Sequence, residues 1–436
     1  MKAKIIVLGG GISAVSFAFF LKTKSFLILE KNAELGGLLR TREIRGFKFD
    51  KGGHVLHLRN PIVVDLIVNH LMQNKLVKKE RKAKVFLKGQ LIDYPFQYNF
   101  NKLGDEVIVQ DIRKTLPESI PEKYTYKSLE EWLLLNFGKG LYKWFFNPYL
   151  TKLLKTNLSE VDWRWGNMFI PVLSEGIRKI LKKGGCMSGK VGYNPEFYYP
   201  LQGGIQHVII AFLKNKKEII QKSLTNCRVE AIDVEKRRVI TNRGYIDYKF
   251  MVSTIPLKDF LEISTINDLL KDIAKNLRYV SLAIYNYGFK GDLKVDAHWI
   301  YVPEEKYTFH RIIFPSNICK NNAPKGSFSI SVESSLKPGE FPKTNSWEIL
   351  ENLKNMGIIS EDSEPIVIDR DLIEIAYVVF HRKYFKDLDI IRRELTDYDI
   401  WLLGRFGSWE YSFIEKNILD AMRLANVLKK YSINQN

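Results

Sequence analysis

A glycine-rich turn near the N-terminus carries the clearest chemical pattern in the chain. The run Gly9-Gly10-Gly11-Ile12-Ser13-Ala14 fits G-x-G-x-x-A, and an acid, Glu30, closes the next apolar run. In such a turn the first glycine permits a sharp bend, the second lets the main chain approach a pyrophosphate, and the alanine lets a helix pack close to a strand. Free N–H groups at the helix start attract the phosphates, and the acid accepts a hydrogen bond from a ribose hydroxyl. The pattern predicts a dinucleotide site.

The elements that must position this turn lie on both sides of it. Lys2 to Leu8 has the composition of a buried parallel strand, Ile12 to Leu21 that of a helix, and Phe26 to Glu30 that of a second strand. A lone glycine pattern is weak evidence, but a pattern that follows a strand and opens a helix is strong evidence. We therefore predict a short βαβ unit at the N-terminus.

The remainder of the chain changes texture several times without an internal repeat or a disordered linker. Long helical patterns rich in Trp, Phe and Leu give way to alternating strand patterns and then to a final strand and helix. We predict an α/β fold, in which a Rossmann-type nucleotide-binding domain carries a helical insertion and an antiparallel β-sheet domain. The predicted segments are 1–95 and 198–275 for the first two parts of the nucleotide-binding domain, 100–195 for the insertion, 278–385 for the substrate-binding sheet domain, and 386–436 for the closing strand and helix.

Length and composition limit the classes of protein. At 436 residues, with 45% hydrophobic and 27% charged residues, the chain has the profile of a soluble globular protein of two or three domains. Its three cysteines are scattered and predict neither a disulfide framework nor a metal site. No apolar run approaches the roughly 20 residues that span a bilayer. The apolar stretch from Ala14 to Leu21 lacks a following cleavage site, so we expect no signal peptide and a cytoplasmic protein.

The net charge of +18 is large and restricts the partners. A basic surface attracts nucleic acid, anionic membranes or phosphorylated small molecules. No segment interleaves aromatic and basic residues as nucleic-acid-binding segments do, and the run from Lys78 to Lys82 is typical of a solvated surface. We therefore expect no nucleic-acid partner, and a phosphate-bearing small molecule stays open.

Three further segments resemble the glutathione-reductase-like FAD enzymes, which include amine oxidases and protoporphyrinogen oxidases. Glu34 to Thr41 places two glycines and an arginine after the acid and is similar to the second flavin fingerprint of that group. Val229 lies in a strand where these enzymes contact the adenine, and Ser253 to Pro256 resembles the strand end that closes the cofactor site. The resemblance implies that the nucleotide-binding domain binds FAD.

Four other segments resemble the UDP-galactopyranose mutases, particularly the eukaryotic-type branch. Phe49 to Val55 is similar to W-D-x-G-G-H-V, a loop that brings a histidine near the isoalloxazine, and Tyr94 to Gln97 is similar to Y-P-x-Q, which binds the uracil. Trp299 to Pro303, followed by Arg311, resembles W-x-Y-F-P and an arginine on the substrate pyrophosphate. Gly404 to Tyr411 resembles G-R-x-G-S-W-x-Y, which serves the flavin and the diphosphate.

The resemblance assigns roles residue by residue. It implies cofactor contacts from Gly9, Gly11, Ile12, Ser13, Ala14, Glu30, Lys31, Gly37, Leu38, Gly53, His54, Val229, Thr254, Gly404, Arg405 and Tyr411. It implies substrate contacts from Tyr94, Phe96, Gln97, Tyr301, Arg311, Tyr377 and Tyr411, and catalytic roles for His54 and Arg311. Arg311 has a second argument, because an arginine inside an apolar strand needs a partner and a diphosphate provides one. His54 could instead cap a turn, and Tyr94 could be a core aromatic residue.

The mutase resemblance also implies a reaction. These enzymes interconvert the pyranose and furanose forms of a nucleotide-diphosphate sugar, in routes that supply polysaccharide biosynthesis, and reduced FAD acts through an N5–sugar adduct. NAD(P)H or another reductant keeps the flavin reduced, and a UDP sugar is the favoured substrate. An FAD-dependent oxidase or desaturase of the protoporphyrinogen or amine oxidase type is the alternative, since it shares every FAD segment. A flavin-bearing binding protein without catalysis is a third possibility.

Several positions depart from the mutase pattern on the sugar side. They are Leu150, Leu154, Asn167 and Ile318, and the run after Tyr411 departs as well. These departures predict an altered sugar pocket beside conserved flavin and uracil segments. The identity of the sugar therefore stays open.

Overall fold

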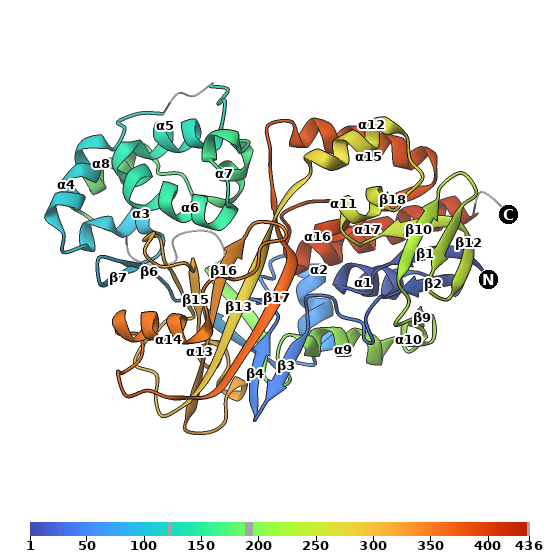
Figure 1. Ribbon diagram of the computed structural model, residues 1–436, viewed down its shortest axis with the longest axis horizontal. Helices are drawn as coiled ribbons and strands as arrows, with labels where there is room; N and C mark the ends of the chain where they lie inside the picture. Colours follow the sequence, from blue (N-terminus) through green and yellow to red (C-terminus); the bar gives the residue numbers. More distant parts are fainter. Residues whose placement is uncertain (121–123, 188–194, 434–436) are drawn as a thin grey trace.

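The computed structural model describes residues 1–120, 124–187 and 195–433, with side chains described up to residue 429. Two large sheets and a helical lobe make up this part of the chain (Figure 1). The sheet near both termini has the order β10-β11-β12-β1-β2-β9, and β18 pairs with β12 beside it. Its strands are β1 (Lys2–Leu8), β2 (Phe26–Leu29), β9 (Ser223–Leu224), β10 (Val229–Asp233), β11 (Arg238–Thr241), β12 (Gly244–Ser253) and β18 (Ile400–Leu402).

The N-terminal βαβ unit forms as predicted, within one residue at each boundary. β1 runs parallel to β2 and to β12, and the residues from Ile5 to Leu8 are almost completely buried. Continuous apolar runs of this kind are typical of parallel strands that are covered on both faces. Helix α1 (Ile12–Phe20) starts directly after the glycine turn and packs against the long helix α17 (Ile414–Ile433). The turn therefore lies at the carboxyl edge of the parallel strands.

The second sheet has the order β17-β13-β16-β15-β14-β6-β7 and is antiparallel except where β14 runs parallel to β6. Its strands are β6 (Ala83–Leu87), β7 (Gln90–Asp93), β13 (Arg278–Lys290), β14 (Trp299–Tyr301), β15 (Arg311–Ile313), β16 (Ser327–Leu336) and β17 (Pro365–Val379). The predicted boundary at residue 95 is therefore wrong for β6 and β7. Phe86 explains why, because its buried ring packs 6.0 Å from Tyr307 in the core of the second sheet.

A helical lobe covers one end of the second sheet, above β6 and β7 in Figure 1. Side-chain caps begin three of its helices, because Asp105, Ser128 and Ser174 each accept a hydrogen bond from a main-chain N–H of the first turn. The helices of the lobe are α3 (Phe96–Asn99), α4 (Glu106–Thr115), α5 (Leu129–Leu141), α6 (Asn147–Leu154), α7 (Arg164–Phe169) and α8 (Glu175–Lys182).

The remaining elements connect these three parts. The paired strands are β3 (Thr41–Ile44) with β4 (Phe47–Asp50), and β5 (Leu76–Glu80) with β8 (Glu196–Pro200). The other helices are α2 (Pro61–Val64), α9 (Gln206–Asn215), α10 (Glu218–Gln221), α11 (Leu257–Glu262), α12 (Asp268–Asn276), α13 (Pro315–Ile318), α14 (Ser346–Asn355), α15 (Tyr384–Asp397) and α16 (Gly404–Gly407). Irregular helical turns cover Asp65–Leu71, Phe100–Lys102, Tyr142–Phe146, Leu158–Glu160 and Lys320–Asn322.

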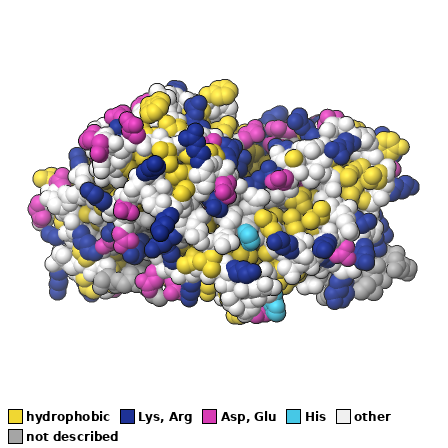
Figure 2. Space-filling view, turned by 90° about the horizontal axis from the view of Figure 1, so that it is seen from below, with side chains coloured by type: hydrophobic (Ala, Val, Ile, Leu, Met, Phe, Trp, Pro, Cys, Tyr) yellow, Lys and Arg dark blue, Asp and Glu magenta, His cyan; other side chains and the backbone are white. Residues whose placement is uncertain are grey.

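The surface carries its positive charge in a dispersed form. Figure 2 shows Lys and Arg side chains over the whole of one face, with Asp and Glu among them. Among the described residues, no helix has the length and apolar character needed to cross a membrane. The same part of the chain holds no cluster of three His, Cys, Asp or Glu side chains suited to a metal ion.

Candidate functional site

The three glycines of the first turn have different roles. Gly9 has a φ of +88°, and a Cβ there would lie 2.6 Å from Thr254 Oγ1. Gly10 donates its N–H to Glu30 Oε2 at 2.7 Å. Gly11 caps the start of α1 with a φ of −75°, and a Cβ there would meet nothing nearer than Gly37 Cα at 3.9 Å. Gly9 is therefore required by the fold, whereas a Cβ on Gly11, at a helix N-terminus, would make only an ordinary contact with Gly37.

Glu30 locks the turn from the adjacent strand. Its side chain is buried, and its carboxylate accepts hydrogen bonds from Gly10 N–H and, at 2.8 and 2.6 Å, from the main chain and side chain of Asn32. A carboxylate offers about four acceptor positions, so one position remains for a ligand hydroxyl.

Segments distant in the sequence complete this end of the molecule. The Gly36 N–H donates to Gly10 O at 2.7 Å, which brings the second glycine loop against the first turn. Thr254 Oγ1 donates to Leu8 O at 2.7 Å, and a Cβ on Gly404 would collide with Ser13 Oγ. Most of the predicted cofactor residues therefore meet around one turn. Of the others, Val229 is half-buried at the start of β10, Leu38 is half-buried beside the second loop, and Lys31 is exposed.

Five tyrosines, here called the tyrosine cluster, converge from the second sheet, the helical lobe and the segment after α16. They are Tyr94 after β7, Tyr149 on α6, Tyr301 on β14, Tyr377 on β17 and Tyr411 after α16. The ring centroids of Tyr94 and Tyr149 lie 4.8 and 5.5 Å from that of Tyr301, and the rings of Tyr377 and Tyr411 stack at 6.0 Å. Four of the five are predicted substrate residues, and Tyr149 was not predicted.

The two groups of rings in this cluster are joined through His310. Its ring centroid lies 6.3 Å from that of Tyr149 and 6.2 Å from that of Tyr377. Tyr94 and Tyr149 keep part of their surface accessible, yet burial raises the pKa of both phenols well above the usual value.

Arg311 has a partner within the protein, which corrects the argument from the sequence. Its Nε donates to Glu333 Oε2 at 2.6 Å, Nη2 forms an ion pair with the same carboxylate, and Nη2 also donates to Tyr377 OH at 3.2 Å. Glu333 is fully buried and stands directly opposite Arg311 in the β15–β16 register. The arginine therefore does not require an external anion to be stable in its strand, although Nη1 has no partner among the described residues.

Glu333 also connects Arg311 to the predicted histidine loop. Its Oε1 accepts the Gly53 N–H at 3.0 Å. In the same loop, His54 Nδ1 lies 3.2 Å from Gly52 O. Burial lowers the pKa of His54 to about 4, and the positive charges of Arg405 and Arg311 lower it further. His54 is therefore a neutral imidazole near pH 7.

Arg405 lies beside the tyrosine cluster and has no carboxylate partner among the described residues. It donates to Ser412 O at 2.8 Å and to Ala376 O at 3.0 Å, and its guanidinium lies 4.3 Å from the ring centroid of Tyr411. Within the described chain it forms no ion pair. Its positive charge therefore stays uncompensated beside the tyrosine cluster.

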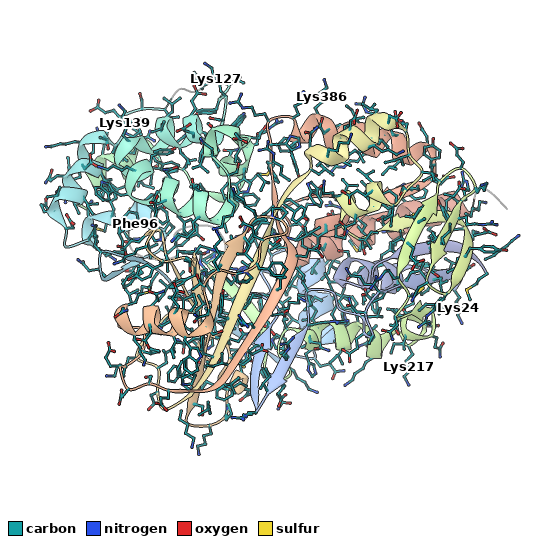
Figure 3. The ribbon with its side chains drawn as sticks, in the orientation of Figure 1. Lys24, Phe96, Lys127, Lys139, Lys217 and Lys386 are labelled. Atoms are coloured by element: carbon teal, nitrogen blue, oxygen red, sulfur yellow. The ribbon has the colours of Figure 1, made fainter. Side chains whose placement is uncertain are left out.

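The predicted uracil segment is buried at the base of the lobe. Figure 3 labels Phe96 where the lobe meets the end of the β6–β7 hairpin, while the labelled lysines stand on the outside. Phe96 is fully buried, with its ring 5.1 Å from that of Phe145. Gln97 is also buried and donates to Pro171 O at 3.2 Å, but its Oε1 has no partner among the described residues. An unpaired buried amide oxygen is costly without a ligand or water, so this oxygen lacks the partner that such groups normally have.

The positions that depart from the mutase pattern lie in different surroundings. Leu150 and Leu154 are buried in the core of the lobe, Ile318 is buried on α13, and Asn167 is exposed on α7. On α6, Leu150 lies between Tyr149 and Thr151. Its side chain therefore projects from a different face of the helix than the ring of Tyr149.

Sequence reasoning missed Tyr149 and Glu333. The signal for Glu333 was present, because it is the one acid in the strand Ser327–Leu336 and Arg311 is the one base in the strand Arg311–Ile313. Two lone opposite charges in neighbouring apolar strands predict a buried pair. Tyr149 carried no such signal, since only the packing of α6 against the sheet brings it to Tyr301.

Comparisons with known proteins agree with this architecture. A family described as an NAD(P)-binding Rossmann-like domain matches residues 7–69. A solved structure of reduced UDP-galactopyranose mutase is similar, with a TM-score of 0.88 and 22% sequence identity over 98% of this chain and 96% of that chain. A protein from Exiguobacterium sp. 255-15 described as a protoporphyrinogen oxidase gives 0.74 and 18% over 98% and 99% of the two chains. A putrescine oxidase bound to putrescine gives 0.66 and 13% over 99% of both. The chain therefore has the Rossmann-type α/β fold of FAD-binding flavoproteins.

Proposed function

We propose that this protein is an FAD-dependent enzyme that interconverts the pyranose and furanose forms of a nucleotide-diphosphate sugar. The observation that carries the proposal is the charge beside the tyrosine cluster. Arg405 has no carboxylate partner, and the Nη1 group of Arg311 has no partner among the described residues. Two guanidinium groups among phenols favour a diphosphate, because planar N–H donors pair well with phosphate oxygens.

The first glycine turn supports FAD as the cofactor. Gly11 has no side chain at the N-terminus of α1, where a pyrophosphate is favoured, and Glu30 keeps an acceptor position for a ribose hydroxyl. Gly37 lies against the main chain of Gly11, the Thr254 hydroxyl donates to Leu8 O, and Gly404 lies against the Ser13 side chain. Reduced FAD would supply an electron-rich centre able to attack the anomeric carbon of a sugar.

The protein's own residues would bind the substrate and hold its charge. The unpaired Gln97 Oε1 would accept a hydrogen bond from the imide N–H of a uracil. Tyr94, three residues earlier in the chain, would provide an aromatic ring for the base. Arg405 and Arg311, with the hydroxyls of Tyr377 and Tyr411, would stabilise the negative charge that grows on the diphosphate as it leaves the sugar. His54, neutral near pH 7, would face the cofactor without adding a further positive charge.

A comparison of UDP and GDP affinities tests which nucleotide base the site binds. UDP should bind more tightly than GDP, because a single buried amide oxygen suits the imide of uracil and a purine needs more room and more partners. Equal or tighter binding of GDP would contradict the assignment of the Tyr94–Gln97 segment.

An oxidase or desaturase is the alternative, since it uses the same fold. The electrostatics favour the mutase over an amine oxidase, because a cationic amine would be repelled by Arg405, which has no carboxylate beside it. An acidic porphyrinogen would not be repelled, so the alternative needs a chemical test.

The decisive experiment uses redox dependence. The enzyme is reduced with dithionite or NAD(P)H under anaerobic conditions and incubated with a panel of UDP sugars that includes N-acetylated and deoxy sugars. We expect an isomeric nucleotide sugar by chromatography, with many turnovers for each reduction. Product that forms only with the oxidised enzyme, and that tracks oxygen consumption one for one, would establish an oxidase instead.

A further inference from the structure

Lys152 on α6 joins the helical lobe to the second sheet. Its ammonium donates to Val302 O at 2.9 Å, to Glu304 O at 2.5 Å and to Phe309 O at 3.2 Å. All three carbonyls belong to the connection between β14 and β15, residues 302–310. A lysine ammonium has three N–H donors, so the full donor capacity of this side chain is used on one connection.

The same face of α6 carries a member of the tyrosine cluster. Tyr149 and Lys152 are three residues apart, so they lie on one side of the helix. The ring of Tyr149 lies 5.5 Å from Tyr301 and 6.3 Å from His310. Tyr301 precedes the connection that Lys152 binds, and Arg311 follows it. The lysine therefore fixes the segment that joins two proposed substrate residues, Tyr301 and Arg311, while its own helix carries Tyr149 of the tyrosine cluster.

We propose that Lys152 is a positioning residue, which holds α6 and Tyr149 against the β14–β15 connection and so sets the geometry of the substrate site. This inference rests on the proposed function only for the identity of the ligand. The mechanical role of the lysine follows from its three carbonyl contacts.

The protonation state of Lys152 bears on this role. Burial, together with the charge of Lys155, lowers its pKa to about 7, although Glu304 and Glu305 act in the opposite direction. His310, also close, stays neutral because burial lowers its pKa. The ammonium therefore predominates below about pH 7 and the neutral amine above it. The amine has only two N–H donors for three carbonyls, so the contact weakens as the pH rises.

The chain contains a matched control. Lys216 also donates to three main-chain carbonyls, at 2.9 Å to Ala18 O, 3.0 Å to Phe19 O and 2.6 Å to Leu21 O. These carbonyls lie at the C-terminal end of α1, opposite the end that carries Gly11. Lys216→Met removes the same kind of contact at a place remote from the tyrosine cluster.

The test compares Lys152→Met with Lys216→Met as FAD-loaded proteins. Hydrogen exchange is measured by mass spectrometry, and binding of UDP-glucose is measured by flavin fluorescence. We expect Lys152→Met to speed exchange in residues 302–310 and to weaken UDP-glucose binding about tenfold, as when a charge-assisted hydrogen bond is lost. Lys216→Met should leave both unchanged and speed exchange near residue 21. FAD content should match wild type in both variants.

The outcomes separate the two proposals. If Lys152→Met behaves like Lys216→Met in residues 302–310 and in affinity, the positioning role is wrong. If wild type binds neither UDP-glucose nor UDP, the proposed UDP-sugar substrate fails, and the exchange data alone decide the role of Lys152. Should Lys152→Met not fold, Lys152→Arg replaces it, because an arginine keeps its charge at every accessible pH. Wild-type affinity should then fall above about pH 7 while that of Lys152→Arg stays level. Parallel pH profiles would contradict the proposal.

Discussion

The glycine turn and the tyrosine cluster are built in opposite ways. The turn is made from main-chain groups of one short segment, with Glu30 closing it from the adjacent strand. The cluster is made from side chains of five elements, and its charges depend on partners far away in the sequence, such as Glu333 for Arg311. The contrast shows that a local pattern can reveal a main-chain site, whereas the state of a charged side chain depends on what tertiary structure puts beside it.

The largest expected effect breaks the main-chain site alone. Gly11→Val should fold, because a Cβ there meets nothing within 3.9 Å, but it should lose nearly all bound FAD since the side chain fills the space proposed for the pyrophosphate. Visible absorbance per protein measures this. Gly176→Val on the surface of the lobe is the control, because its Cβ also meets no neighbour. Wild-type flavin content in Gly11→Val would show that the turn does not hold the cofactor.

The next effect breaks the buried pair beneath the cluster. Glu333→Gln leaves Arg311 without its carboxylate and should cost about 3 kcal/mol of the free energy of unfolding, the usual loss when one partner of a buried pair is removed. Urea unfolding measures the loss. The double variant Glu333→Gln with Arg311→Met should recover part of it, because no unpaired charge remains. A single variant as stable as wild type would mean that Arg311 is solvated rather than paired.

A smaller effect separates the two arginines. Arg405→Met should weaken UDP binding by about 2 kcal/mol, roughly thirtyfold, while changing stability little, because its protein contacts are neutral carbonyls and a ring. Arg311→Met should instead lower stability as well, since it leaves Glu333 unpaired. Titration of flavin fluorescence with UDP gives the affinities. Unchanged UDP affinity in Arg405→Met would place the diphosphate elsewhere.

The smallest expected effect concerns Asp50, the last residue of β4, which anchors the start of the loop that contains His54. Its carboxylate accepts from Thr41 Oγ1 at 2.7 Å and from Tyr199 OH at 2.6 Å, and burial raises its pKa to about 6. A raised pKa in the folded state favours folding at low pH, and this contribution is lost as the pH rises toward 6 and above. Asp50→Asn should therefore gain stability relative to wild type by about 1 kcal/mol between pH 5 and about 7.

The comparison for Asp50 is the difference between the two urea-unfolding free energies at each pH, which removes the titration of all other groups. Asp362→Asn, at an exposed position, is the control and should show no such trend. A difference that does not change with pH would mean that Asp50 is ionised throughout this range.

Much of the fold could be predicted from local sequence. The βαβ unit was predicted because the conformations of continuous apolar runs and of the glycine turn depend mainly on residues close in the sequence. The strands β6 and β7 were assigned to the wrong region, because an apolar hairpin fits either sheet and only the core around Tyr307 selects one. The candidate tyrosines Tyr94, Tyr301, Tyr377 and Tyr411 were identified through resemblance, and the structure places their rings in one cluster with Tyr149 and His310.

The sequence by itself determined the features that depend on neighbouring residues in the chain. These are the positive φ of Gly9, the start of the helix at Gly11 and the position of the acid after β2. Tertiary structure decided which charges are compensated. The pairing of Arg311 with Glu333 left Arg405 as the uncompensated cation, and the docking of α6 added Tyr149 to the cluster. The physical reason is the range of the interactions. Backbone sterics act over a few residues, whereas desolvation and ion pairing depend on every group that the fold brings within a few ångströms.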